Sequence, residues 1–123
     1  MNVLVVDDEA AIRELLQLIL ETEGHAVTLA PDGAVALAQL ETLEPDVIIL
    51  DLKMPVMDGH EFARRYHERV GAKAPIVVIS AVQRLAEATE LHACAVLAKP
   101  FELQVLLDAI SQCTGEKAGA LAN

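Results

Sequence analysis

Short apolar segments alternate with amphipathic segments along most of the chain. Five of the apolar segments are rich in Val, Ile, Leu and Ala and are bounded by charged residues, Gly or Pro. This pattern is typical of strands that are buried on both faces of a sheet. It predicts strands at residues 2–6, 25–30, 47–50, 76–79 and 94–98.

The segments between the strands carry apolar residues at helical spacing. From Ile12 to Ile19, for example, they follow the i, i+3, i+4, i+7 pattern of one helix face. Asp58, followed three residues later by Glu61, resembles a capping box at a helix start. The predicted helices are residues 9–23, 34–43, 58–69, 82–91 and 101–113.

This alternation favours the α/β class, because parallel strands need crossover connections that place helices on both faces of the sheet. The expected fold is a doubly wound (βα)5 five-stranded parallel sheet. No linker or repeat divides the chain, so one domain is expected at residues 1–114. The small and polar residues 115–123 are expected to form a short flexible tail.

Composition narrows the possible functions. The apolar runs are well short of the ~20 residues needed to cross a bilayer, and the amino terminus lacks a signal-peptide pattern. We therefore expect a cytoplasmic protein with no membrane contact. Nine Lys+Arg against nineteen Asp+Glu give a net charge of −10, which argues against direct nucleic-acid binding. Cys94 and Cys113 lack metal-site or CxxC spacing, and we expect them to be reduced thiols in the core.

Polar side chains gather where the predicted strands end. Asp7 and Asp8 follow the first strand, Asp51 the third, Ser80 the fourth and Lys99 the fifth. In open α/β sheets, ligands bind at the carboxyl ends of the strands, beside the point where the strand order reverses. If the first and third strands are neighbours there, the three aspartates form one carboxylate cluster.

The chemistry of this set points to phosphoryl transfer. Carboxylate oxygens are suitable ligands for Mg²⁺ or Mn²⁺. Lys99 and Ser80 can bind phosphoryl oxygens, which leaves Asp51 as the nucleophile. Each residue alone has an ordinary explanation, such as a helix cap for Asp8 or a solvated surface charge for Lys99. The combination at one sheet edge favours a site.

Several motifs, in this order, resemble those of the receiver domain of two-component response regulators. They lie at residues 5–9, 50–55 with 58–59, 79–81 and 97–101. The resemblance covers the chain from Val3 to about Cys113 and implies a flavodoxin-like fold with strand order 2-1-3-4-5. It also implies a signalling switch, here of the single-domain type, that controls a partner protein.

The resemblance implies a role for each acidic residue. Asp51 would accept a phosphoryl group from a phosphohistidine on a sensor histidine kinase or a histidine phosphotransfer protein. Asp8, Asp51 and the backbone carbonyl of Lys53 would ligate Mg²⁺. Asp7 would support the ion through water.

It also implies how the phosphate is recognised. Lys99 would pair with the phosphoryl oxygens, Ser80 would move to bind the new phosphate, and the Lys99–Pro100 bond would be cis. Val96 stands where receivers commonly carry an aromatic residue, and the interval from Ser80 to Lys99 is shorter than is common. These departures predict a shortened fourth helix. They also predict an output surface other than the usual one, for example the first helix, or a reshaped version of the usual surface.

Two other functions stay open from the residues. One is an aspartyl-phosphate phosphohydrolase, although Lys53 stands where such enzymes need a second aspartate. The other is a receiver-like interaction module that is never phosphorylated. The cognate kinase and the oligomeric state are not specified by the sequence.

Overall fold

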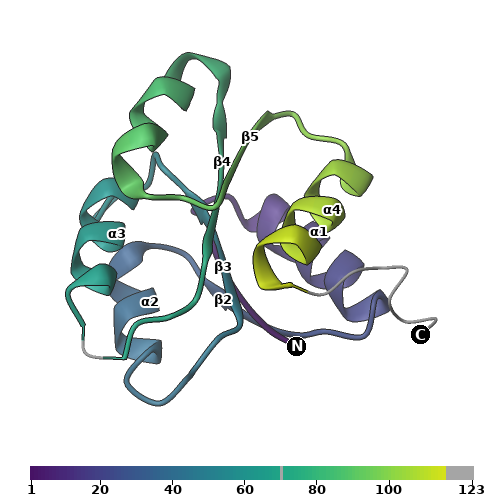
Figure 1. Ribbon diagram of the computed structural model, residues 1–123, viewed down its shortest axis with the longest axis horizontal. Coiled ribbons are helices and arrows are strands. Elements are labelled where there is room, and N and C mark those ends of the chain that lie inside the picture. Colours follow the sequence, from purple (N-terminus) through teal and green to yellow (C-terminus); the bar gives the residue numbers. More distant parts are fainter. Residues whose placement is uncertain (70, 116–123) are drawn as a thin grey trace.

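The computed structural model describes residues 1–69 and 71–115. Along these residues five strands alternate with five helices (Figure 1). The strands are β1 (Asn2–Val6), β2 (Ala26–Ala30), β3 (Val47–Asp51), β4 (Ile76–Ala81) and β5 (Ala95–Lys99). The helices are α1 (Ala10–Thr22), α2 (Gly33–Gln39), α3 (Gly59–His67), the 3-10 helix η1 (Val82–Leu91) and α4 (Leu103–Thr114). Apart from Gly115, the predicted tail at residues 115–123 lies outside the described residues.

The strands form one parallel sheet in the order β2-β1-β3-β4-β5, which confirms the expected fold and strand order. Val6, the last residue of β1, pairs with Ala30 of β2 and with Leu50 of β3. The chain order therefore reverses at β1. The residues that follow β1 and β3 meet at one edge of the sheet.

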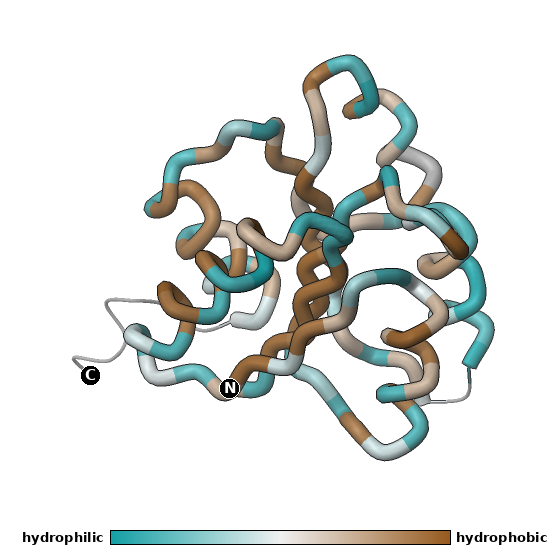
Figure 2. The backbone as a smooth tube through the Cα atoms, turned by 180° about the vertical axis from the view of Figure 1, so that it is seen from behind, coloured by the Kyte–Doolittle hydropathy of each residue, from teal (hydrophilic) through white to brown (hydrophobic). Residues whose placement is uncertain are grey.

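Two apolar layers enclose the sheet, because side chains alternate between its faces along each strand. Leu4 and Val6 of β1 pack in the layer under α2, α3 and η1, whereas Val3 and Val5 pack in the layer under α1 and α4. Figure 1 shows these helices on opposite sides of the sheet. In Figure 2 the central strands form the most continuous hydrophobic part of the chain, as the sequence pattern predicts.

The helices are short, and aspartates cap two of them. Asp32 accepts a hydrogen bond from the backbone N–H of Val35 at the start of α2, and Asp58 accepts one from Glu61 at the start of α3, both at 2.9 Å. These bonds satisfy N–H groups that lack a partner within a first helical turn. Within residues 1–69 and 71–115 there is no helix with the length and apolar character needed to cross a bilayer.

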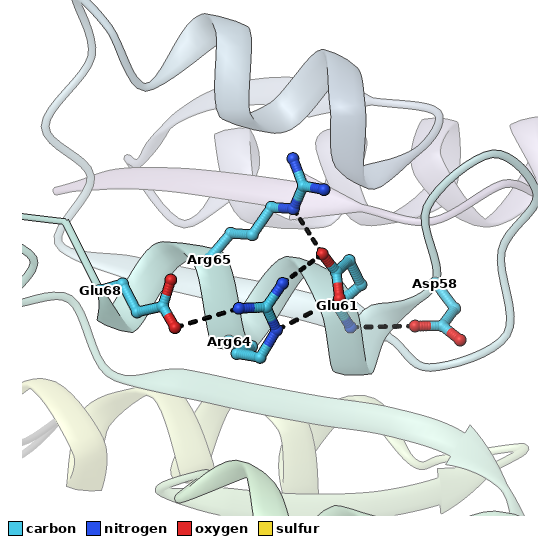
Figure 3. Close-up of polar contacts among 5 residues, drawn as sticks. All are labelled: Asp58, Glu61, Arg64, Arg65 and Glu68. Atoms are coloured by element: carbon cyan, nitrogen blue, oxygen red, sulfur yellow. Dashed lines mark hydrogen bonds and ion pairs between the residues drawn. The ribbon is translucent and has the colours of Figure 1, made fainter.

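Only half of the predicted capping box forms on α3. The Glu61 carboxylate binds Arg64 and Arg65 further along the helix, and Arg64 also binds Glu68 (Figure 3). These groups lie on the exposed face of α3, where such pairs stabilise a helix only slightly. The two arginines are therefore part of an ordinary charged surface.

The connection between β4 and β5 is helical but is a 3-10 helix, η1. A 3-10 helix rises about 2.0 Å per residue, against about 1.5 Å for an α-helix. This more extended winding lets a short connection cover the length of the crossover. His92 ends η1 with φ 54°, a left-handed conformation that usually favours glycine.

The cysteines do not match the expectation from the sequence. Cys94 and Cys113 form a disulfide, with their Cα atoms 5.9 Å apart, so the prediction of reduced core thiols is wrong. The physical reason is the topology: α4 runs back beside β5, which brings the residue before β5 next to the last turn of α4. The local sequence around each cysteine contains no sign of this pairing.

Candidate functional site

Most of the predicted site residues lie at the carboxyl edge of the sheet. Asp51 is the last residue of β3, Lys99 is the last of β5, and Asp7 directly follows β1. The parallel register places Asp51 opposite Ile79 of β4. The alternation of strands and helices thus brings together residues that are far apart in the sequence.

The ammonium group of Lys99 joins three carboxylates. Its Nζ atom lies 3.1 Å from Oδ2 of Asp7, 3.2 Å from Oδ2 of Asp51 and 3.2 Å from Oε1 of Glu9. Asp7 is fully buried and Asp51 is 5% exposed, whereas Glu9 is exposed. Lys99 is therefore the counter-ion that allows two carboxylates to be buried side by side.

The position of Asp7 is fixed by the backbone around it. Its N–H donates to the carbonyl of Ala30 at 3.1 Å, which extends the β1–β2 pairing by one residue. The N–H of Glu9 donates to Oδ1 of Asp7 at 2.9 Å, and Nη1 of Arg13 donates to the Asp7 carbonyl at 2.7 Å. Asp7 thus connects the end of β1 to the first turn of α1.

Burial and neighbouring charges shift the pKa values of Asp7, Asp51 and Lys99. Burial raises the pKa of Asp7 and of Asp51 above the ordinary aspartate value, even though the charge of Lys99 opposes both shifts. Burial also disfavours the charged form of Lys99, but the negative charges of Asp7 and Asp51 outweigh it and raise the lysine pKa. A single ammonium shared among several carboxylates does not fully compensate for their burial. The site consequently favours additional positive charge.

A metal ion could supply that charge. Carboxylate oxygens of Asp7, Asp8, Glu9 and Asp51 lie within 4.8 Å of one another. This all-oxygen donor set fits a hard divalent cation such as Mg²⁺. Asp8 is exposed, and the N-cap of α1 is Glu9, so Asp8 is not used as the helix cap.

Ser80 and Lys53 lie beside this cluster and make fewer contacts. Ser80 is fully buried on β4, next to the Ala81 that pairs with Lys99, and its Oγ atom has no hydrogen-bond partner among the described residues. Lys53 has an exposed side chain, and a hydrogen bond from its backbone helps to hold the Asp51 carboxylate in its ionised form. Neither residue is among the partners of Lys99.

Two members of the site were missed in the sequence. Glu9 belongs to the acidic cluster and binds Lys99, and Arg13 fixes the Asp7 carbonyl. The direct succession of Asp7, Asp8 and Glu9 at a strand end could have suggested the first. The contact of Arg13 with a backbone carbonyl has no corresponding sequence signal.

The loops around Asp51 are tightly shaped. A Cβ atom at Gly59 would lie 2.7 Å from the carbonyl oxygen of Asp51, so only glycine fits at the start of α3 without displacement.

Val56 has φ 67° and is 83% exposed, an unusual conformation for a β-branched residue. The Lys99–Pro100 peptide bond is cis, as the resemblance to receiver domains implied.

Comparison with known proteins agrees with this architecture. Residues 3–111 match the family model of the response regulator receiver domain. Response regulator MprA of Mycobacterium avium (strain 104) is 39% identical over 110 residues, which cover 87% of this chain and 48% of that protein.

Two solved structures are also similar. The response regulator TrrA of Thermotoga maritima, in complex with Mg²⁺-BeF, has a TM-score of 0.82 and 29% identity, covering 91% of this chain and 97% of that chain. The receiver domain of a sensor histidine kinase from Pseudomonas aeruginosa, with a magnesium ion coordinated in the active site cleft, has a TM-score of 0.83 and 27% identity. That match covers 93% of this chain and 97% of the other.

The chain therefore belongs to the receiver domain family of response regulators. It spans about half the length of the curated relatives that it matches.

Proposed function

We propose that Asp51 accepts a phosphoryl group from a phosphohistidine on a sensor histidine kinase or a histidine phosphotransfer protein. The observation that carries this proposal is the position of Lys99, whose ammonium contacts both Asp51 and Asp7 at one sheet edge. A carboxylate oxygen of Asp51 attacks phosphorus, a P–O bond forms and the P–N bond breaks. The electron pair of the broken bond stays on the imidazole nitrogen.

Each neighbour of Asp51 has a role in this proposal. Asp8, Asp51 and the backbone carbonyl of Lys53 would hold Mg²⁺, or Mn²⁺, while Asp7 would support the ion through water. Such an ion would supply positive charge beside the transferred group. Lys99 pairs with the phosphoryl oxygens, and Ser80 turns toward them, since its buried hydroxyl has no partner among the described residues.

In this reading the domain is a switch and not an enzyme that acts on small molecules. It assists its own phosphorylation and dephosphorylation, and the added charge beside Ser80 favours a different arrangement of the segment after β4. A phosphohydrolase is disfavoured, because the position two residues after Asp51 is Lys53 and the chemistry of such enzymes needs an aspartate there. We place the domain at residues 1–114.

The test is phosphorylation by acetyl phosphate in the presence of Mg²⁺. Intact-mass measurement should show one added phosphoryl group on the wild type and none on Asp51→Asn. Asp46→Asn is the matched control, since Asp46 directly precedes β3 at its opposite end and should not affect labelling. Failure of the wild type to be labelled by acetyl phosphate or to bind beryllofluoride would favour the unphosphorylated interaction module. Steady release of phosphate from small phosphorylated compounds would instead favour the hydrolase.

The output surface is a separate part of the proposal. Val96 lies on β5 and is 41% exposed. Because it is a valine, β5 has no aromatic side chain at this position that could move together with Ser80. We therefore expect the response to use another surface, such as that of α1. Amide exchange with and without beryllofluoride tests this, and changes confined to η1, β5 and α4 would contradict it.

A further inference from the structure

A covalent link closes the part of the chain that contains Lys99. The disulfide joins Cys94, the residue before β5, to Cys113 in the last turn of α4, across 19 positions of sequence. Cys94 is exposed, whereas Cys113 is partly buried and packs against the apolar layer under α1 and α4. Lys99 and the cis Lys99–Pro100 bond lie inside the closed loop. The 3-10 helix η1 lies outside it.

We propose that Cys94 and Cys113 form a reversible thiol–disulfide exchange site whose redox state controls how firmly β5 and α4 are held. Its reactants are a dithiol reductant and a disulfide oxidant. The exchange itself is independent of phosphorylation. Its effect on the switch rests on the function proposed above.

The exchange reaction proceeds in two steps. A thiolate of the dithiol attacks one sulfur of the Cys94–Cys113 bond, the S–S bond breaks, and the other cysteine leaves as a thiolate that takes up a proton. The second thiol of the reductant then attacks the mixed disulfide and releases the remaining cysteine. Two electrons pass to the protein, and the reductant becomes a disulfide. Oxidation is the reverse reaction.

The exposure of Cys94 is what makes this exchange possible, because the attacking thiolate must reach a sulfur atom. A fully buried disulfide would be reduced only after unfolding. Here the bond lies where β5 begins and α4 ends, at the opposite end of β5 from Lys99. A reductant can therefore reach it without disturbing the acidic cluster.

The disulfide lies where it can affect how firmly β5 and α4 are held. Among the described strands β5 is an edge strand that pairs only with β4. Besides that pairing, it is held by packing against η1 and α4. Closing a loop of this length restricts the unfolded chain and any partly opened state in which β5 and α4 separate. Reduction removes that restriction from the segment that carries the ammonium group of the site.

The first test measures the site alone. Protein purified without reductant should contain no alkylatable thiol under denaturing conditions, and two after treatment with a dithiol. The dithiol should lower the melting temperature of the wild type by at least about 5 °C. The double variant Cys94→Ser with Cys113→Ser should melt like the reduced wild type and should not respond to dithiol. Two alkylatable thiols in air-oxidised protein, or a melting temperature that dithiol leaves unchanged, would overturn the proposal.

The second test measures coupling to the switch. Amide exchange is compared with and without beryllofluoride in the oxidised and the reduced wild type. We expect β5 and α4 to respond, in addition to the surface of α1, only when the cysteines are reduced, and in the double serine variant with or without dithiol. Equal responses in the two redox states would overturn the coupling. If beryllofluoride changes nothing in either state, the proposed phosphorylation fails and the coupling with it, whereas the thiol and melting results still decide the exchange site.

Discussion

The Nζ atom of Lys99 lies 3.2 Å from the carboxylate of Asp51, although 48 residues separate them in the sequence. This contact joins the last residue of β5 to the last residue of β3 across β4. It neutralises part of the charge that burial makes unfavourable at Asp51 and Asp7. The same ammonium group lies in the space where a divalent cation and a phosphoryl group would bind, and it places a positive charge there.

Replacing Lys99 should therefore have two opposite effects. Lys99→Gln leaves Asp7 and Asp51 buried without their counter-ion, so the free energy of unfolding should fall by about 2 kcal/mol in the absence of metal. Removal of the positive charge should at the same time tighten Mg²⁺ binding. Urea unfolding in EDTA measures the first effect, and a Mg²⁺ titration measures the second. The exposed Lys73, replaced by Gln, is the control and should change neither quantity.

Ser80 should be dispensable for stability but not for signalling. Because its buried Oγ atom has no hydrogen-bond partner among the described residues, Ser80→Ala should leave the free energy of unfolding unchanged or raise it by up to about 1 kcal/mol. The amide-exchange response to beryllofluoride should be lost. Ser111→Ala, on α4, should retain that response. A Ser80→Ala protein destabilised by more than about 1 kcal/mol would show that the hydroxyl makes a stabilising bond in solution.

Gly59 should be required for the shape of the site. In Gly59→Ala the added methyl group meets the carbonyl oxygen of Asp51 and the Cα atom of Leu52, each at 2.7 Å. The backbone beside Asp51 must shift, which should cost about 1–3 kcal/mol of stability and slow labelling by acetyl phosphate.

Gly24→Ala is the control that separates the loss of stability expected for Gly59→Ala from its slower labelling. Gly24 has φ +92° and open space around it, so alanine there should cost about 1 kcal/mol through backbone strain alone. Its labelling rate should equal that of the wild type. Equal labelling rates for both alanine variants would show that the close approach of Gly59 to Asp51 does not matter for phosphorylation.

Val56 should be a point of stored backbone strain. A β-branched residue at φ 67° is unfavourable, whereas asparagine tolerates the left-handed region. Val56→Asn should therefore raise the free energy of unfolding by about 0.5–1 kcal/mol, as measured by urea denaturation. Val82→Asn, at another exposed valine without a positive φ, should give no gain. A loss of stability in Val56→Asn would mean that the valine side chain makes contacts that outweigh the strain.

Periodicity was sufficient to predict the strands and helices, because buried parallel strands and amphipathic helices differ in a repeat that the sequence displays directly. The positions of Asp7, Asp51, Ser80 and Lys99 followed, since each stands at or beside a strand end. The strand order did not follow from periodicity. It came from the resemblance to receiver domains, and the pairing of β1 with both β2 and β3 confirms it.

The remaining features depend on contacts between distant residues. Glu9 reaches Lys99 across 90 positions, and Cys94 meets Cys113 only because α4 returns along β5. A local window contains neither partner. The 3-10 winding of η1 has no sequence signal either, because the apolar spacing of residues 82–91 indicates only that the segment is helical.

The position of Lys99 on the last strand also affects when the site around Asp51 can form during synthesis of the chain. Asp7 directly follows β1 and Asp51 ends β3, so both leave the ribosome early, but their ammonium partner belongs to the last strand of the sheet. A nascent chain that has emerged only through β4 thus has the acidic cluster without its internal cation. The pocket around Asp51 is completed only by the final strand, so a chain that ends before β5 lacks the counter-ion of both buried carboxylates.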